Sequence, residues 1–520
     1  MDRARVEERS VLSPPASAPQ QPGDLDAREG QEACARSATR NRLSRHRSRR
    51  LLPRAHPAVV VLAACCAALL HQDMHTGLSG DVYFHLAAGR WMLAHHSVIR
   101  RDMFSYTVRG RPWIADEWGY EVALAWLVRA LGPVSFWLVS AGSCSVALLL
   151  SAASWRRIGA TGLWIAALAC VATSGLLVGL APRPQDPSYA LFAGELLLLR
   201  CARRDRRWLL ALPPLLLVWA NIHGSFLLGL AVLLLEILWS CLATSHAVRQ
   251  VAPALPTRAV VASTAGSALA TFVNPHGPAL LGYALHVASS GRIAALVEEW
   301  QPPDFHTPLL LLLVAGPVAW LLVTLGRSRA ALHLGDVTLA VLLLLATLQA
   351  VRFLPYFVLA WCAAASRWSP RRPEGISSSR LSLPLAACLA SGLVIGGHIP
   401  PGAPLRGGAA VDMPVGPASF LLHRRGRVFT TYWWGDYLVD LGVPVFVDGR
   451  TDLYAGTGVL ATYLAVADLT VDPDTVLARY RVRWVLWDEH SALSTFLAED
   501  PRWRAVLRSG DAVVFEHLAR

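Results

Sequence analysis

The chain contains no lysine, so all 48 of its basic residues are arginine, and its formal net charge is +12. The absence of lysine excludes both a P-loop lysine and a Schiff-base lysine. Charge is also scarce: charged residues make up 16% of the 520 residues, whereas soluble globular domains carry about 25%. So few charges cannot cover a water-exposed surface of this size. Together with 54% hydrophobic residues, this deficit favours a membrane protein.

Cysteine pairs are missing as well. The nine cysteines are scattered, most lie inside apolar runs, and none forms a C-x-x-C pair. They are therefore interpreted as small buried hydrophobes, not as a disulfide framework or a zinc site. The C-terminal part also lacks a glycine pattern typical of nucleotide binding. We expect no nucleotide site there and no nucleic-acid partner.

The first 56 residues are rich in Pro, Ala, Ser, Gln and Arg, with eight arginines between Arg36 and Arg54. Such a segment cannot bury enough apolar surface to offset the loss of chain entropy, so residues 1–56 are predicted to form a disordered basic tail. The tail is too long and too polar for the charged start of a signal peptide. The apolar run that follows is therefore predicted to be a retained helix.

Apolar segments long enough to cross a bilayer, which takes about 20 residues, recur along residues 57–400. They predict about 11 transmembrane helices. The segments are 57–72, 133–153, 159–181, 187–200, 208–222, 225–243, 259–273, 308–325, 334–350, 353–366 and 381–398.

Arginine-rich loops set the expected orientation, because cytoplasmic loops carry an excess of basic residues. With the tail in the cytoplasm, eleven alternations place every basic cluster between spans on the cytoplasmic side. These clusters are Trp155–Arg157, Arg200–Arg207, Arg249–Arg258, Arg327–Arg329 and Arg367–Arg372. The other side receives the long first loop, 73–132, and the C-terminal domain, 410–520. We therefore expect a multi-pass inner-membrane protein with a cytoplasmic N-terminus and an extracytoplasmic C-terminal domain.

The C-terminal domain alternates short strand-like runs with helical ones, which predicts a small α/β unit. The expected strands are Arg427–Trp433, Val443–Val447, Val482–Trp487 and Ala512–His517. Asp448 and Arg450 follow one of them, where a binding loop is common. The fold class is thus an α-helical polytopic membrane protein with a small C-terminal α/β domain.

The first loop mixes aromatic rings with charges, which suits the headgroup layer, and predicts interfacial helices over 81–96 and 117–131. Asp81 and His85 are four residues apart and share one helical face. Asp116 and Glu117 open the second helix. Two interpretations stay open. Asp81 and Asp116 cap the helices, or Asp81 with nearby Glu117 supplies carboxylates for general-base or metal chemistry.

Two extracytoplasmic arginines, Arg183 and Arg352, lie closest to span ends. Arginine binds phosphate oxygens well, because its guanidinium is always charged and forked. The alternative for Arg352 is a structural ion pair with an acid such as Glu195 or Asp304. His223 lies in a turn at a span end. No local spacing supports it as a metal ligand, so a turn or interface role is the more frequent one.

Several motifs resemble a family of bacterial polytopic membrane proteins of the GT-C glycosyltransferase type. The resemblance covers about residues 57–520. The motifs are Asp81-x3-His85-Leu86-x2-Gly89, Asp102-x-Phe104-Ser105-Tyr106-Thr107, Trp113, Glu117-Trp118, Arg183-Pro184-Gln185, Trp219-x-Asn221-x-His223-Gly224, Asn274-Pro275-x-Gly277, Glu299-Trp300-Gln301-x2-Asp304, Trp434-Gly435-Asp436-Tyr437-Leu438 and Val447-Asp448-Gly449-Arg450-x-Asp452-Leu453-Tyr454.

Broader GT-C enzymes include oligosaccharyltransferases, protein O-mannosyltransferases and the aminoarabinose transferase of lipid A. The resemblance implies an inverting glycosyltransferase that takes sugar from a polyprenyl-phosphate donor, with Asp81 in the place of the catalytic carboxylate. Those enzymes often show two adjacent acids in the first loop. Here Asp81 is followed by Val82, and the acid pair is Asp116-Glu117. The identity of the base and the need for a divalent metal ion therefore stay open.

The expected function is transfer of a sugar from a lipid-linked donor to an extracytoplasmic acceptor, with Asp81 or Glu117 as the base. Arg183 and Arg352 are expected to bind the donor phosphate. Substrate contacts are expected from His85, Asp102, Asp116, Asn221, His223, Glu299, Asp304, Asp448 and Arg450. A non-catalytic membrane scaffold is the first alternative. A transporter is disfavoured, because no internal repeat is visible and the polar motifs lie at span ends.

Overall fold

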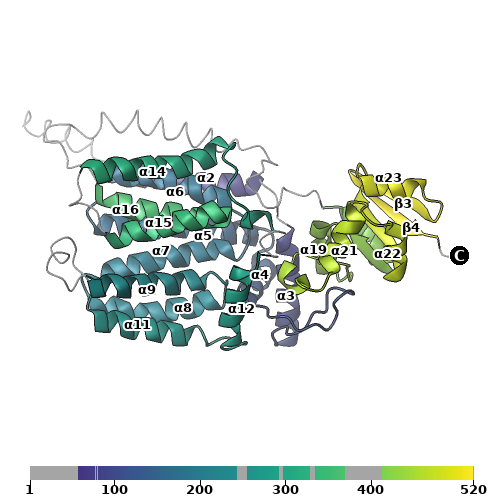
Figure 1. Ribbon diagram of the computed structural model, residues 1–520, viewed down its shortest axis with the longest axis horizontal. Helices are drawn as coiled ribbons and strands as arrows, with labels where there is room; N and C mark the ends of the chain where they lie inside the picture. Colours follow the sequence, from purple (N-terminus) through teal and green to yellow (C-terminus); the bar gives the residue numbers. More distant parts are fainter. Residues whose placement is uncertain are drawn as a thin grey trace, which may run out of the picture. The chain divides into compact units, whose positions relative to one another are not determined.

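The computed structural model describes residues 57–75, 78, 80–242, 255–291, 297–327, 334–368 and 413–518. These residues form a mostly helical protein with one small sheet near the C-terminus (Figure 1). The predicted disordered tail, 1–56, and the last expected span, 381–398, lie outside the described residues.

Ten of the eleven expected spans coincide with helices. They are α2 (Pro57–His75), α5 (Val134–Arg157), α6 (Gly162–Gly179), α7 (Gln185–Ala202), α8 (Leu212–Ala220) with the 3-10 helix η1 (Arg206–Ala211) before it, α9 (Phe226–Leu242), α11 (Thr257–Ala270), α14 (Pro308–Arg327), α15 (Leu334–Gln349) and α16 (Leu354–Ala365). Three of the helices, over Ala58–His75, Val134–Arg157 and Gly162–Gly179, are long and apolar enough to cross a membrane. This helical architecture is that of a multi-pass membrane protein, and the full count of eleven crossings stays a prediction.

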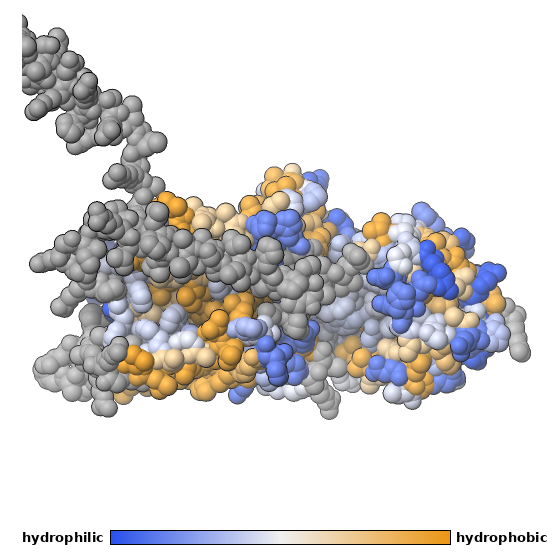
Figure 2. Space-filling view, turned by 90° about the horizontal axis from the view of Figure 1, so that it is seen from above, coloured by the Kyte–Doolittle hydropathy of each residue, from blue (hydrophilic) through white to orange (hydrophobic). Residues whose placement is uncertain are grey.

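The helices pack around a common apolar core in which Trp155, Phe192 and Trp219 are fully buried. Small residues allow close approach: a Cβ built on Gly175 of α6 would stand 2.8 Å from the Val358 side chain of α16. Large apolar side chains also face outward, Leu269 and Leu312 among them. Figure 2 shows such apolar residues in orange over the helical part, whereas hydrophilic residues in blue are more frequent over the C-terminal part. An outward apolar surface of this kind suits a lipid environment.

The first loop contains the two helices that its sequence predicts, α3 (Asp81–His95) and α4 (Trp118–Leu131). They pack so closely that a Cβ on Gly89 would overlap the backbone of Glu121. The capping interpretation is wrong. The cap positions belong to Gly80 and Glu117, and neither helix has a side-chain hydrogen bond at its cap. Asp81 and Asp116 are therefore free of a capping role.

The C-terminal sheet has the strand order β1-β2-β4-β3. Strand β1 is parallel to β2, and β4 is antiparallel to both β2 and β3. The strands are β1 (Arg427–Thr430), β2 (Val482–Asp488), β3 (Trp503–Ser509) and β4 (Ala512–His517). The helices of this part are α18 (Val415–Leu422), α19 (Tyr432–Asp440), α20 (Thr451–Tyr454), α21 (Val459–Ala467), α22 (Pro473–Arg479) and α23 (Ala492–Glu499).

Two expectations for this sheet need correction. The expected first strand ends at Thr430, because the Thr431 hydroxyl accepts a hydrogen bond from the Trp434 amide and starts α19. The expected strand over 443–447 makes only single bridges, from Val445 to Ser105 and Val428. Strand β3 was not predicted.

The extended stretch of the first loop lies against this C-terminal part. The Tyr106 amide donates to the Val445 carbonyl at 3.1 Å, and the Thr107 hydroxyl donates to the Phe446 carbonyl at 2.7 Å. Residues after Val445 are thereby brought beside α3 and α4. The chain between α11 and α16 completes the surroundings with α12 (Ala279–Ser289) and the 3-10 helices η2 (Glu298–Trp300) and η4 (Val351–Phe353). The 3-10 helix η5 (Ser366–Trp368) directly follows α16.

Candidate active site

Two adjoining cavities, of about 280 and 380 Å³, lie where the first loop, the helix ends and the C-terminal part meet. They share polar residues from four separate segments, which makes this junction the candidate active site. The shared lining consists of Asp81, Arg183, Gln185, Val297, Arg352, Gly449 and Thr451.

Two arginines form the cationic side of the site. Arg183 lies just before α7, its Nε is 3.5 Å from Oδ2 of Asp81, and its Nη1 forms an ion pair with Glu299. Arg352, in η4, stacks its guanidinium over the Trp300 ring at 4.5 Å. Both residues predicted to bind phosphate therefore line both cavities.

Among the described residues, Arg352 forms no ion pair and donates no hydrogen bond. The expected alternatives do not bind it: Oδ1 of Asp304 contacts the exposed His306, and both carboxylate oxygens of Glu195 are buried without a hydrogen-bond partner in the described part of the chain. A cation left unpaired beside a cavity is costly unless an anion occupies the cavity.

The acidic residue Glu117 lies between two imidazoles. Its Oε2 is 3.6 Å from Nε2 of His85, and its Oε1 is 3.6 Å from Nε2 of His223. The second ring nitrogen of each imidazole, Nδ1, also has a polar partner. Nδ1 of His85 lies 3.2 Å from Oε1 of Glu121, and Nδ1 of His223 lies 2.7 Å from the Ser225 hydroxyl. His223 is thus part of this array as well as of its turn.

Burial is the largest cause of the pKa shifts of the acids that line the first cavity. It raises the pKa of Glu117, and the charges of Asp116 and Glu121 raise it further. Burial also raises the pKa of Asp116, with a further contribution from Asp452, and raises the pKa of Glu121 to about 8. Burial lowers the pKa of His85 to about 3, so this imidazole is neutral at physiological pH. The cavity thus combines carboxyl groups of raised pKa with His85, an imidazole of lowered pKa.

Gly449 separates two carboxylates at the cavity junction. The position of a Cβ on this glycine would be 2.8 Å from Oδ2 of Asp436 and 3.0 Å from Oδ1 of Asp81. The Gly449 amide donates to Oδ1 of Asp436 at 2.6 Å. Burial raises the pKa of Asp436, and the charge of Asp81 adds to the effect. Only glycine leaves room for both acids here.

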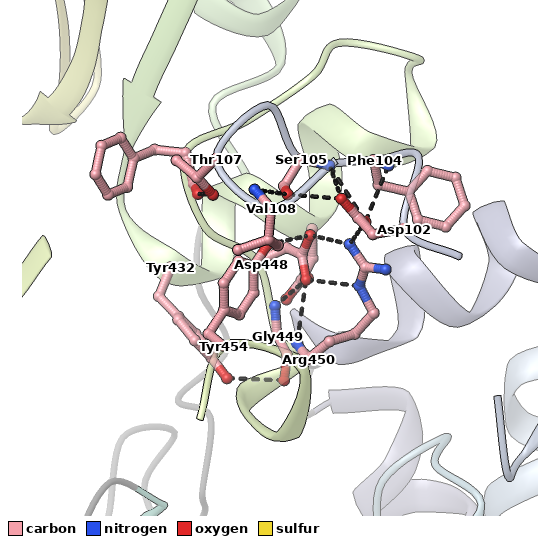
Figure 3. A network of polar contacts seen from close by, with 12 residues as sticks. Asp102, Phe104, Ser105, Thr107, Val108, Tyr432, Asp448, Gly449, Arg450 and Tyr454 are labelled. Atoms are coloured by element: carbon pink, nitrogen blue, oxygen red, sulfur yellow. Dashed lines mark hydrogen bonds and ion pairs between the residues drawn. The ribbon is translucent and has the colours of Figure 1, made fainter. Parts of the chain in front are cut away.

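Three of the predicted contact residues form a closed cluster instead (Figure 3). Arg450 donates from Nη2 to Asp102 and to Asp448, each at 2.6 Å, and from Nε to Asp448 at 2.8 Å. Its guanidinium also lies over the Trp113 ring. Asp102 and Asp448 are fully buried and lie outside the lining of both cavities. Asp102 thereby connects the first loop to the C-terminal part, and Asp448 binds Arg450 from within the C-terminal part.

Two further predicted residues lie outside both cavities. Asn221 accepts a hydrogen bond from Trp118 Nε1 at 2.8 Å and donates to the carbonyls of Leu217 and Val273, so it joins helix ends. Asp304 is half exposed. By contrast, Glu299 lines the second cavity, and His85, Asp116, His223 and Arg450 line the first.

Sequence reasoning missed four residues of the site: Glu121, Tyr283, Asp436 and Asp452. Tyr283 of α12 donates its hydroxyl proton to Oδ2 of Asp452 at 2.6 Å. Glu121 lies four residues after Glu117, which is the spacing of one helical face and a usable signal. Asp436 and Asp452 belong to motifs that carry the family resemblance, but they were not predicted as site residues. Nothing in the sequence marked Tyr283, because α12 was not expected.

The donor set gives no support for a metal centre: among the described residues, no three His, Cys, Asp or Glu side chains converge in a way that could hold a metal ion. We therefore derive no catalytic step through a metal ion.

Comparisons with known proteins bear on the fold. No protein-family model and no curated protein matches the sequence. Among solved structures, the archaeal oligosaccharyltransferase AglB from Archaeoglobus fulgidus, in complex with an inhibitory peptide and a dolichol-phosphate, has a TM-score of 0.56 at 10% identity. That match covers 83% of this chain and 69% of AglB. The apo form of the A. fulgidus oligosaccharyltransferase has a TM-score of 0.54 at 10% identity, with 84% and 70% covered.

ArnT from Cupriavidus metallidurans, in the apo state, is 17% identical over 88% of this chain and 97% of ArnT, with a TM-score of 0.48. At such low identities, similarity to solved structures is evidence for the fold alone. The matches to the oligosaccharyltransferase agree with the family that the sequence motifs suggested. The chain has the fold of the GT-C glycosyltransferases.

Proposed function

We propose that the protein is a membrane glycosyltransferase that moves a sugar from a polyprenyl-phosphate donor to an acceptor hydroxyl outside the cytoplasm. The GT-C fold supports this proposal, and so does AglB, whose structure holds a dolichol-phosphate.

One observation carries the proposal: the guanidinium of Arg352 faces a cavity with no carboxylate in contact, within the described residues. A partly buried cation without a partner favours an anionic ligand, and forked guanidinium groups suit phosphate oxygens. Arg183 lines the same junction. Two arginines at one junction can stabilise the negative charge that grows on a departing phosphate.

The wall of the first cavity suits the lipid part of such a donor. Beyond the arginines it is lined by apolar side chains from α9, α12 and η4. They are Leu227, Leu228, Ala284, Val287, Ala288 and Phe353. A cavity lined by both arginines and apolar side chains is complementary to an isoprenoid phosphate, which combines an anionic phosphate with an apolar chain.

The chemistry needs a base for the acceptor hydroxyl. In an inverting transfer, the acceptor oxygen forms a bond to the anomeric carbon while the bond from that carbon to the phosphate oxygen breaks. Its electron pair leaves with the phosphate, and the hydroxyl proton passes to a carboxylate. Asp81 and Glu117 both line the cavity and are partly exposed to it. Such a base contributes about 10²- to 10⁴-fold to the rate.

The test uses the purified protein in liposomes with a polyprenyl-phosphate sugar and a cell-envelope extract as the source of acceptor. We expect the wild type to release polyprenyl phosphate. In the double variant D81N/E117Q we expect this release to be at least about 100-fold slower, with binding of polyprenyl phosphate unchanged. The variant R129Q, which changes an exposed arginine outside both cavities, is the matched control.

A membrane scaffold would give the opposite pattern. It predicts that D81N/E117Q and R352L leave the cellular role intact, while removal of the C-terminal part abolishes it. Full activity of D81N/E117Q would refute the enzymatic proposal.

A further inference from the structure

Five exposed arginines gather at the end of the helices that lies away from the candidate active site. Two of them close α5 and three follow α7. We name them the outer arginine cluster: Arg156, Arg157, Arg204, Arg206 and Arg207. Helix α7 begins at Gln185, which lines both cavities, and a helix of its 18 residues is about 27 Å long. The cluster is therefore separate from the site described above.

Hydrogen bonds join the two halves of the cluster. Arg204 donates from Nη2 to the Arg157 carbonyl at 2.6 Å. Less than two turns earlier in the chain, Arg200 donates from Nη1 to the Ser154 carbonyl at 3.4 Å. Helices α5 and α7 also pack against each other. The end of α5 is thus held beside the segment after α7, and the five guanidinium groups belong to one surface.

Other arginines at this end of the helices already have acid partners. Arg200 and Arg367 both bind Oδ2 of Asp336, at 3.4 and 2.8 Å. Arg203 binds Oε2 of Glu236 at 2.9 Å. By contrast, no ion pair within the described residues includes a member of the outer arginine cluster. Its positive charges are therefore available to a ligand.

One acid accompanies the cluster. The stretches 153–161 and 203–211 contain a single acidic residue, Asp205. Its Oδ1 accepts a hydrogen bond from the Arg207 amide at 3.0 Å and so caps η1. Five guanidinium groups thus face one carboxylate that is already engaged with the backbone. The surface carries an excess of positive charge, which favours an anionic ligand.

The neighbouring side chains place this surface beside lipid. Helix α5 is long and apolar enough to cross a membrane, and Arg157 is its last residue. Directly after Arg207 come Trp208, which is 44% exposed, and Leu210, which is 77% exposed. Exposed Trp and Leu beside basic side chains are typical of the layer where lipid headgroups meet acyl chains.

We propose that the outer arginine cluster, together with Trp208 and Leu210, binds an anionic phospholipid. The forked guanidinium groups bind the headgroup phosphate, and an acyl chain contacts the two apolar side chains. Basic surfaces between helices at one face of a membrane are a recurring type of anionic-lipid site. A zwitterionic headgroup carries its own cation, so the excess positive charge of the cluster favours a headgroup with net negative charge.

This inference goes beyond the proposed glycosyl transfer. The site lies at the other end of α7 from the cavities, and it requires neither the sugar donor nor the acceptor. A phospholipid that binds the folded protein there also stabilises it, because a ligand specific for the native state shifts the unfolding equilibrium.

The experiment is native mass spectrometry of the purified protein with phosphatidylglycerol and phosphatidylcholine of the same acyl chains. We expect the wild type to bind phosphatidylglycerol at least about 10-fold more tightly. This preference should be lost in the variant R156Q/R157Q/R204Q/R206Q/R207Q. The control removes five exposed arginines elsewhere and should keep the preference; it is R109Q/R111Q/R129Q/R424Q/R425Q.

A second variant keeps every charge and so also serves if the first one fails to fold or insert. In W208S/L210S we expect binding of phosphatidylglycerol to weaken about 5-fold, because the acyl contact is lost. Glycerol phosphate, which has no acyl chain, should compete only weakly with the lipid. Strong competition by glycerol phosphate would assign the surface to soluble phosphate esters and overturn the lipid site.

Three other results would overturn the proposal. They are equal binding of the two lipids by the wild type, an equal loss of preference in the control variant, and unchanged lipid binding in W208S/L210S. An equal loss in the control would show that only net charge matters. None of these measurements involves sugar transfer, so their failure leaves the proposed function standing, and absent sugar transfer leaves the lipid result valid.

Discussion

Two arginines of this protein, the buried Arg450 and the partly buried Arg352, show how differently a guanidinium can be used. Arg450 is enclosed by Asp102 and Asp448 with contacts of 2.6 Å, and it joins the first loop to the C-terminal part. Arg352 rests on the Trp300 ring, has no acid in contact within the described residues, and borders both cavities. The charge of the first is used within the fold, whereas the charge of the second is available to a ligand.

Disrupting the cluster of Arg450, Asp102 and Asp448 should have the largest effect, a loss of stability. The variant R450M leaves Asp102 and Asp448 buried without their cation, and loss of one partner of a buried ion pair costs about 3–5 kcal/mol of unfolding free energy. We expect a large fall in Tm or loss of folded protein, measured by thermal unfolding in detergent. R352M should leave Tm unchanged. Equal destabilisation by both changes would remove the contrast between the two arginines.

Removing the charge of Arg352 should affect binding of the phosphate ligand and not folding. R352L is expected to weaken binding of a polyprenyl phosphate by about 10- to 100-fold, because a hydrogen bond to a charged group contributes about 1.5–3 kcal/mol. Titration of the purified protein with polyprenyl phosphate measures this change, with R129Q as the control. Unchanged affinity in R352L would show that the phosphate binds elsewhere.

A smaller effect is expected at the junction between the two acids. In G449A the new methyl group would lie within 3.0 Å of carboxylate oxygens of Asp436 and Asp81, and overpacking of this kind costs about 1–3 kcal/mol. Thermal unfolding measures the loss. The control is G282A in α12, where no atom lies within 4 Å of the new Cβ and no loss of stability is expected. Equal Tm values for the two variants would contradict the close approach.

The last prediction concerns the dependence of stability on pH. The pKa of Glu121 is raised from 4.5 to about 8, so the folded protein binds a proton there that the unfolded chain releases above about pH 4.5. Stability from this group is complete below that pH and is lost as the pH rises towards 8. The slope is at most about 1.4 kcal/mol per pH unit. Unfolding midpoints between pH 5 and 8 should therefore fall less steeply for E121Q than for the wild type. Parallel curves would exclude the proton on Glu121.

The helices were predictable from the sequence because each carries its own signal. Apolar runs predicted α5 and α6, and aromatic residues mixed with charges predicted α3 and α4. The local signal fails where tertiary contacts decide. Val445 belongs to an expected strand but makes single bridges, because its neighbours are the first loop and β1. The helix α12 was missed because its eleven residues are too few to count as a span.

The site was predictable as a collection of residues and not as an arrangement. Asp81, Glu117, Arg183 and Arg352 do line one cavity. The sequence could not show that Arg450 is enclosed by acids while Arg352 has none in contact. Their difference depends on Asp102, which lies 348 residues from Arg450 along the chain. Such distant pairing is set by the fold, and no local pattern reveals it.

The central claim is that the junction beside Arg352 binds a lipid-linked phosphate. The most direct test is an experimental structure of the protein in a lipid nanodisc with added polyprenyl phosphate. We predict phosphate density within hydrogen-bond distance of the Arg352 guanidinium, with the isoprenoid chain along α9 and α12. Phosphate density at another place, or a carboxylate of the protein bound to Arg352, would contradict the account.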